Sequence, residues 1–170
     1  MKLTAIKNFS RLKAGLRKRC DLLKSSAPSR IINLSTGLAE NGKVDFDDLQ
    51  SERDYVETKA YSRVRAPVCA NTKPMVMIFT YELARRLEGT GVTANIVMPD
   101  FVATNLGKKS GNLSSSILLK MVRPVQISAK KGAETSVYLA SSDEVNGVTG
   151  KCFSKKKEAA TCPTSYDRKT

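Results

Sequence analysis

The chain has 170 residues, of which 41% are hydrophobic and 26% are charged, a composition typical of one folded domain. It contains no histidine, which excludes Ser-His-Asp triads, Cys-His nucleophile pairs and metal or haem sites held by imidazole. The cysteines form no C-x-x-C pair, so zinc ribbons and thioredoxin-type motifs are excluded and no metal site is predicted. We interpret all four as free thiols in a reducing compartment: Cys20, Cys69, Cys152 and Cys162.

The net charge of +13 is concentrated at the two ends of the chain. Residues 1–24 carry eight basic residues and one acidic residue, and residues 151–170 carry six basic and two acidic residues. We therefore predict a basic N-terminal arm or helix over 1–24, a folded domain over 25–154 and a basic tail over 155–170. Aromatic or polar side chains that could contact nucleic-acid bases are scarce among the basic residues, which disfavours nucleic-acid recognition. A non-specific nucleic-acid or anionic-membrane surface is kept as an alternative.

No stretch of the sequence approaches the roughly 20 apolar residues of a membrane span. We expect a location in the cytoplasm or at the periphery of an intracellular membrane. The basic, acid-poor segment 1–24 also suits a mitochondrial transit peptide. The competing interpretation is a surface helix, because four leucines lie near helical spacing: Leu12, Leu16, Leu22 and Leu23.

Short apolar runs alternate with amphipathic segments along the chain. Strands are predicted where β-branched residues dominate short apolar runs, at 30–35, 92–98 and 147–153. Helices are predicted over 75–87 and 129–140, with a short one around 115–121, and residues 37–54 are predicted to be a loop. This order predicts an α/β fold with a parallel sheet of about three strands flanked by helices.

Each long predicted helix has an apolar side. In 75–87 this side is formed by Val76, Phe79, Leu83 and Leu87. In 129–140 it is formed by Ala133, Val137 and Leu139. We expect these sides to face the sheet.

The segment 89–91 has the Gly-x-Gly spacing of a phosphate-binding loop. It follows a predicted helix and opens a strand, the reverse of the order that cradles a phosphate. We therefore predict a helix cap and a tight turn here.

Several runs, in order, closely resemble the second half of the short-chain dehydrogenases/reductases, especially the retinol-dehydrogenase-like branch. The first is Ser26-Ala-Pro-Ser-Arg-Ile-Ile-Asn-Leu-Ser-Thr36, and it is followed by matching runs at 42–52, 79–93, 101–105, 131–136 and 147–151. The resemblance implies a partial Rossmann-type sheet and transfer of hydride between NAD or NADP and an apolar, retinoid- or lipid-like alcohol or carbonyl compound.

In this family a serine holds the substrate oxygen, a tyrosine is the acid/base, and a lysine four residues later lowers the tyrosine's pKa. A phenol with a pKa near 10 needs such a cation to act as a base at neutral pH. Here Thr36 stands at the serine position. Counting forward from the first runs places Tyr61 on the tyrosine, with Arg65 at the lysine. Counting back from residue 79 places Cys69 and Lys73 there instead.

The two registers differ by eight residues, which implies an insertion. We favour Lys73 as the retained cation, with Tyr61 as the acid/base if residues 62–69 loop out. Cys69 and Arg65 are the alternatives. Pro67 and Pro74 fall where the helix that carries these residues should be continuous, and a proline is costly in a helix interior. Pro74 is tolerated if the helix begins there.

Further along, Pro99-Asp100 stands where the family has Pro-Gly, which puts a carboxylate near the expected nicotinamide. The resemblance assigns Pro99, Thr104 and Lys73 to cofactor binding. The family's first half, with its Gly-rich pyrophosphate loop, has no counterpart in the sequence.

We therefore expect a truncated, divergent copy that binds neither NAD nor NADP tightly and has little or no activity. The alternative is a catalytically dead interaction module that pairs through an open sheet edge with itself or with an intact relative. An incomplete sequence would also account for the missing half.

Overall fold

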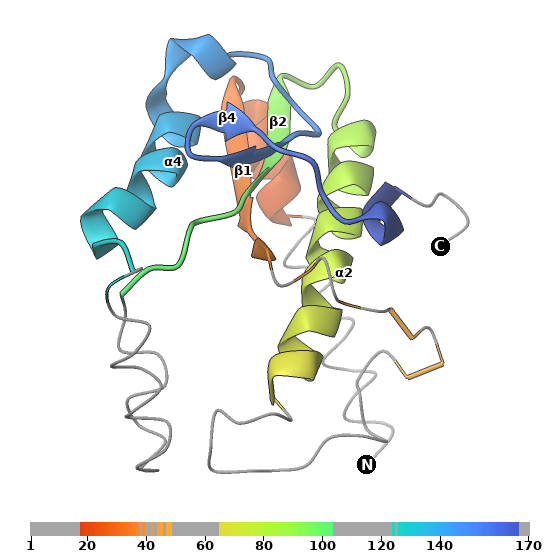
Figure 1. Ribbon diagram of the computed structural model, residues 1–170. Coiled ribbons are helices and arrows are strands. Elements are labelled where there is room, and N and C mark those ends of the chain that lie inside the picture. Colours follow the sequence, from red (N-terminus) through yellow and green to blue (C-terminus); the bar gives the residue numbers. More distant parts are fainter. Residues whose placement is uncertain are drawn as a thin grey trace.

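The fold is described by a computed structural model, shown in Figure 1. It describes residues 18–37, 39, 42, 44–45, 47–48, 65–103, 124 and 126–166. Its strands are β1 (Ser29–Leu34), β2 (Val92–Val97), β3 (Cys152–Ser154) and β4 (Lys157–Glu158). Its long helices are α2 (Arg65–Arg86) and α4 (Ala129–Ser141), and two short 3₁₀ helices are η4 (Asp143–Val145) and η5 (Pro163–Tyr166).

The sheet has the order β1-β2-β3-β4. β1, β2 and β3 run parallel, and β4 pairs antiparallel with β3. The predicted α/β fold with a partial parallel sheet is confirmed. The fourth strand was not predicted, because it is only two residues long and lies in a basic segment. Lys155 and Lys156 form the connecting turn with φ of 51° and 62°, the left-handed conformation that a two-residue hairpin requires.

β2 is the central strand of the fold. It pairs with β1 along its whole length, from Ser29 opposite Val92 to Leu34 opposite Val97, and with β3 through Ile96 and Val97. Five of its six side chains are buried. Burial on both faces is what the predicted apolar run at 92–98 requires.

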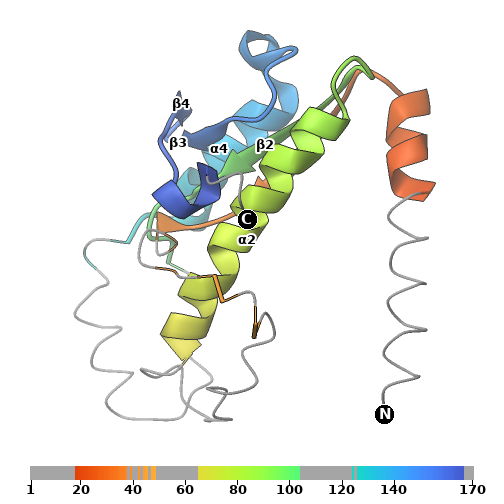
Figure 2. The same cartoon turned by 90° about the vertical axis from the view of Figure 1, so that its right-hand side faces the viewer.

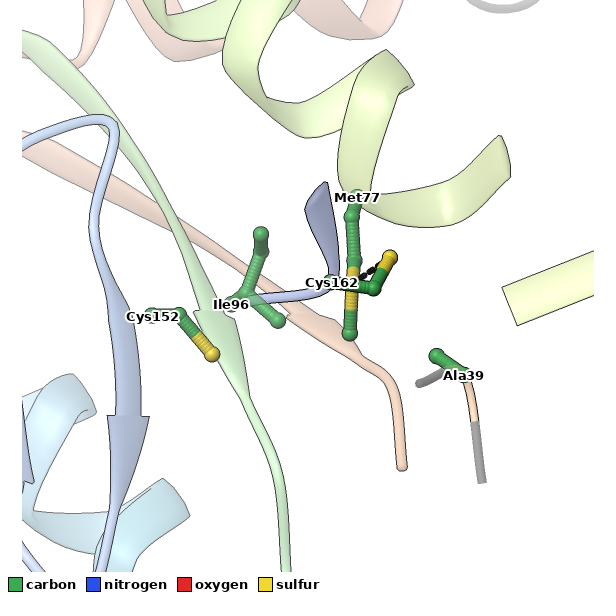
Figure 3. Packing of buried hydrophobic residues seen from close by; sticks show 5 residues of the cluster. All are labelled: Ala39, Met77, Ile96, Cys152 and Cys162. Atoms are coloured by element: carbon green, nitrogen blue, oxygen red, sulfur yellow. Dashed lines mark hydrogen bonds between the residues drawn. The ribbon is translucent and has the colours of Figure 1, made fainter. Parts of the chain in front are cut away.

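Helices cover the two faces of the sheet (Figure 1). Alternation along a strand sends neighbouring side chains to opposite faces, so Ile96 and Val97 belong to different clusters. Figure 3 shows the cluster on the α2 side: Ala39, Met77, Ile96, Cys152 and Cys162. The cluster on the α4 side consists of Val97, Leu139, Val145 and Phe153.

The sulfur atoms in the first cluster are part of the apolar core. Cys152 and Cys162 are each 2% exposed and carry free thiols. The Cys162 thiol contacts the Met77 sulfur at 3.9 Å. Burial raises the pKa of Cys152 to about 11, so this thiol is uncharged and packs as a small hydrophobic residue.

Helix α2 differs from the prediction in its start and in its buried side. It begins at Arg65, ten residues before the predicted start, and it contains Pro74. The apolar side that we assigned was wrong at Phe79, which is 51% exposed. The buried side is formed by Pro74, Met77, Thr80 and Ala84. It continues at Leu87, just after the helix, where burial was predicted.

The polar residue on that buried side has partners. The Thr80 hydroxyl donates to the Val76 carbonyl at 2.6 Å and accepts from the Asn33 amide at 2.9 Å. The bond from Asn33 ties α2 to β1. A buried hydroxyl with both bonds made does not carry the cost of an unsatisfied polar group.

Helix α4 is found where it was predicted, but it too is rotated. Gly132, Thr135 and Leu139 are buried, whereas Val137 is 60% exposed. Gly132 lies against Val102, and a Cβ at this glycine would overlap the valine methyl groups. Close packing on a small residue, rather than hydrophobicity alone, therefore selects the buried side of this helix.

Helix α4 is stabilised at both ends. The Ser128 hydroxyl accepts from the N–H of Lys131 at 3.2 Å, as an N-cap. No basic residue lies in the last turn of the helix itself. Arg30 of β1 supplies the missing charge, donating to the Leu139 carbonyl at 2.9 Å and to the Asn146 side chain.

The segment after β3 packs on the core, although we assigned residues 155–170 to a basic tail. Tyr81 of α2 bonds with the Thr161 hydroxyl at 2.8 Å, and Thr161 bonds with Ser165 at 2.7 Å. Cys162 lies between them in the buried cluster. The C-terminal residues up to Tyr166 therefore hold the middle of α2.

The basic arm is described only from residue 18. Residues 18–25 form a helix that stands apart from α2 (Figure 2), and its Leu22 is 65% exposed. No helix among the described residues is long and apolar enough to cross a membrane. The short helix predicted around 115–121 lies outside the described residues.

Deleting residues 159–170 should lower the melting temperature by several degrees, because it exposes the α2 side of the core and removes buried Cys162. Deleting residues 1–20 should leave the melting temperature nearly unchanged, because the described part of this arm is exposed. Thermal unfolding followed by circular dichroism measures both. Equal effects of the two deletions would contradict this assignment of the core.

Candidate functional site at the carboxyl edge of the sheet

The carboxyl ends of β1 and β2 lie side by side. β1 is followed by Ser35 and Thr36, and β2 is followed by Met98, Pro99 and Asp100. The Ser35 N–H donates to the Val97 carbonyl at 2.9 Å and continues the ladder to this edge. Ligands of open α/β sheets bind beyond such strand ends, so this edge is the candidate site.

Lys73 of α2 reaches the same edge. Its Nζ donates to the Leu34 carbonyl at 3.4 Å, and the Ser35 hydroxyl donates to the Lys73 carbonyl at 3.4 Å. Both distances exceed the usual range for hydrogen bonds of these types, so both contacts are weak. Ser35 is only 2% exposed. The structure thus brings a lysine cation to the end of β1, next to half-buried Thr36.

The structure describes only some of the other residues predicted for the site. Arg65 is the first residue of α2, and Cys69 lies in the same helix, four residues before Lys73. Pro99 is half-buried directly after β2. Tyr61 and Thr104 lie outside the described residues.

Residues 65–69 are helical, so this part of the segment does not loop out as the prediction for Tyr61 required. Along a helix, residues four apart lie on one face, which places Cys69 and Lys73 together in one register. Arg65 lies eight residues before Lys73, or about 12 Å along the helix axis. The described part of this segment is therefore one continuous helix from Arg65 through Lys73.

The two prolines do not interrupt α2. Pro67 falls in the first turn, where a backbone N–H has no helical partner in any case. Pro74 lies inside the helix and has no N–H to donate to the Ala70 carbonyl four residues earlier. The loop after β1 packs at this point, since a Cβ on buried Gly42 would overlap the Ala70 carbonyl oxygen. The helix therefore continues through Pro74 at a point where the loop after β1 lies close against it.

An open groove of about 480 Å³ lies beside Pro99, between α4 and the β3–β4 turn. Asp100 projects toward it and pairs with Lys155 at 3.5 Å. Across the groove, Lys156 pairs with Glu134 at 3.4 Å. Sequence reasoning placed Asp100 near this region but missed the two lysines. The signal that was available is two adjacent lysines directly after a predicted strand.

The Gly-x-Gly segment lies at the other end of the sheet. Gly89 and Gly91 have φ of 74° and 75° and connect α2 to β2. The prediction of a helix cap and a turn is confirmed. This segment precedes β2, so it lies at the edge opposite to Lys73 and Pro99.

Comparison with known proteins decides the family. Human retinol dehydrogenase 14 is 45% identical over 155 residues, which cover 86% of this chain and 42% of that protein. Human retinol dehydrogenase 13 is 38% identical over 151 residues, covering 86% of this chain and 44% of that protein. The chain belongs to the short-chain dehydrogenases/reductases, in their retinol-dehydrogenase-like branch. It spans less than half the length of these relatives, and no family model matches it.

Solved structures agree on the fold. An uncharacterized protein from Mycobacterium paratuberculosis superposes with a TM-score of 0.53 at 19% identity, covering 82% of this chain and 44% of that one. A short-chain type dehydrogenase/reductase from Mycobacterium ulcerans superposes with a TM-score of 0.50 at 18% identity, covering 76% and 41%. These likenesses support the Rossmann-type arrangement of this part of the family's fold.

Replacing Gly42 with alanine should destabilise the protein by about 1–3 kcal/mol, because the new Cβ overlaps the backbone of α2. Gly37 lies in the same loop and has open space where a Cβ would be, so Gly37→Ala is the matched control and should be nearly neutral. Urea unfolding of both variants measures the difference. A neutral Gly42→Ala would show that the loop does not pack beside Lys73.

Proposed function

We propose that this chain carries the substrate-side half of an NAD(P)-dependent short-chain dehydrogenase/reductase. Its substrate class would be an apolar, retinoid- or lipid-like alcohol or carbonyl compound. The observation that carries the proposal is the position of Lys73, whose ammonium group donates to the Leu34 carbonyl at the end of β1, two residues before Thr36. The 45% identity to human retinol dehydrogenase 14 supports the substrate class.

In this proposal the Thr36 hydroxyl holds the substrate oxygen, as the family's serine does. Its additional methyl group narrows the space around that oxygen. Lys73 supplies the positive charge that stabilises an anionic acid/base residue. Because α2 is continuous, we assign the neighbouring acid/base position to Cys69 rather than to Tyr61.

A thiol is a modest replacement for a phenol. Free cysteine has a pKa of about 8.5, and a nearby cation lowers it further. The thiolate can accept a proton, but the S–H group is a weak hydrogen-bond donor to a carbonyl oxygen. We therefore expect any oxidoreductase activity of this chain to be weak.

A whole dinucleotide does not fit the residues described. Lys73 and Pro99 suit the nicotinamide end, together with Thr104 from outside the described residues. A pyrophosphate needs free backbone N–H groups, typically at a Gly-rich helix start. The Gly-x-Gly segment instead lies between a helix and a strand, at the opposite edge of the sheet. The described residues thus provide a place for the nicotinamide end of the cofactor but not for its pyrophosphate.

We predict that the isolated chain binds neither NAD nor NADP tightly. Isothermal titration calorimetry with each nucleotide should show no binding in the micromolar range. A micromolar dissociation constant for either nucleotide would show that the chain holds a complete cofactor site.

The pairing of Cys69 with Lys73 can be tested without activity. In a Cys20→Ser background, Cys69 should be alkylated by iodoacetamide at a lower pH than an ordinary thiol, because the Lys73 charge stabilises its thiolate. Replacing Lys73 with methionine should shift the pH profile upward, whereas Lys73→Arg should largely preserve it. Cys152 and Cys162 are buried and should not react.

An alkylation profile that does not change in Lys73→Met would contradict this register. In that case Tyr61 would regain its place as the acid/base. Retinal reductase assays of Tyr61→Phe and Cys69→Ser then identify the acid/base by which replacement removes the activity.

A further inference from the structure

The groove between α4 and the β3–β4 turn is a second place where the molecule can hold a ligand. Its walls are the residues directly after β2, the first two turns of α4 and the β3–β4 turn. Its volume of about 480 Å³ lies in the range of small-molecule sites, roughly 300 to 1,000 Å³. None of the described residues that line it belongs to β1, so its shape does not depend on what covers the outer edge of that strand.

The groove carries one positive charge more than it carries negative charges. Three lysines line it, Lys131, Lys155 and Lys156, together with two carboxylates, Asp100 and Glu134. Lys155 pairs with Asp100 and Lys156 pairs with Glu134, which leaves Lys131 without an ion pair among the described residues. A ligand with a single negative charge would therefore neutralise the groove, whereas a cation would add to the excess.

The two ion pairs that flank the groove are loose. Their nitrogen–oxygen distances are 3.5 Å for Lys155 and 3.4 Å for Lys156, whereas Lys151 and Glu158 nearby pair at 2.8 Å. A hydrogen bond between an ammonium group and a carboxylate is normally about 2.7–2.9 Å long. Because an ammonium group has three N–H donors, both lysines keep donors that a ligand in the groove can use.

The backbone of the β3–β4 turn is not suited to the residues that it carries. Lys155 and Lys156 have φ of 51° and 62°, and the common residues for such a turn are Asn-Gly or Gly-Gly. A lysine in the left-handed region costs free energy that glycine does not. The role of these two residues is therefore in their side chains, which both reach the groove.

A buried hydroxyl also faces the groove. Thr135 of α4 lines it and is only 6% exposed. Its hydroxyl accepts from the N–H of Lys156 at 3.2 Å, and a hydroxyl has one proton of its own to donate. Thr135 donates that proton to no group among the described residues. The groove thus offers a fixed neutral donor among the ammonium groups, a combination that suits an anionic oxygen.

We propose that this groove binds the carboxylate of an apolar ligand such as a fatty acid. The carboxylate accepts from the Thr135 hydroxyl and lies among the three ammonium groups, and its single charge balances the excess. Half-buried Pro99 and Ile127, with the aliphatic stems of the lysines, contact the first carbons of the chain. The proposal does not involve hydride transfer, so it stands or fails separately from the proposed function.

Amide NMR spectra of the full chain, titrated with octanoate, test the proposal. We expect saturable shifts in the amide signals of Gly132, Thr135 and Lys156, which line the groove. Octanol has the same chain without the charge, and octylammonium has the opposite charge. Each should bind at least about tenfold more weakly than octanoate, because neither replaces the charge-assisted hydrogen bonds of the carboxylate.

Variants at two adjacent lysines separate the groove from the general surface charge. Lys131→Met removes the excess charge and should weaken octanoate binding at least about threefold, whereas Lys131→Arg should retain it. Lys130→Met is the matched control, because Lys130 is exposed in the same turn of α4 but does not line the groove. It should leave the affinity unchanged. Circular dichroism verifies that each variant is folded.

Four results would overturn the proposal. The first is the absence of saturable shifts with octanoate. Equal affinities for octanoate and octanol would show an apolar groove without charge recognition. Equal effects of Lys130→Met and Lys131→Met would show attraction by the surface as a whole. Tighter binding of octyl phosphate than of octanoate would assign the groove to a phosphate group instead of a carboxylate.

Discussion

The structure depends on the burial of β2 between two layers. This strand has neighbours on both edges and helices over both faces, so it excludes water from Ala94, Ile96 and Val97. A parallel sheet needs such double coverage to be stable. α2, α4 and the C-terminal segment are each positioned by the β2 side chains on which they pack. The same arrangement leaves β1 half-exposed and places the ends of β1 and β2 side by side.

The candidate site follows from how α2 is held against this core. Asn33 and Thr80 bond β1 to the middle of the helix, and Tyr81 bonds the other side of the helix to the C-terminal segment. With the helix fixed at these points, Lys73, seven residues or about two turns before Thr80, lies at the end of β1. The site is thus a consequence of helix register, and the register is set by buried polar contacts.

Local sequence was sufficient to predict β1, β2 and α4, because their apolar runs and caps are short-range features. It was insufficient where tertiary packing decides. Pro74 was read as a break in α2, but Gly42 packs against the carbonyl that the proline leaves without its helical bond. Phe79 and Val137 were read as core residues, whereas Thr80 and Thr135 are buried with hydrogen-bond partners.

The site could be predicted in part. Thr36, Lys73 and Pro99 are nominated because they follow predicted strands or match the family's spacing, and their roles stay predictions. The structure places Lys73 at the end of β1. The proposed choice of Cys69 over Tyr61 depends on the start of α2 at Arg65, which no residue near position 65 indicates. Lys155 and Lys156 could not be assigned to a groove, because their place depends on a hairpin in a segment with the composition of a tail.

Hydrogen exchange resolved by residue tests the central claim that α2 is one helix packed on β2. The account predicts the slowest exchange in β2, and similar protection in α2 on both sides of Pro74, because both parts pack on the same core. Fast exchange throughout residues 68–73, with protection only after Pro74, would contradict it. Lys73 would then have no fixed place at the end of β1.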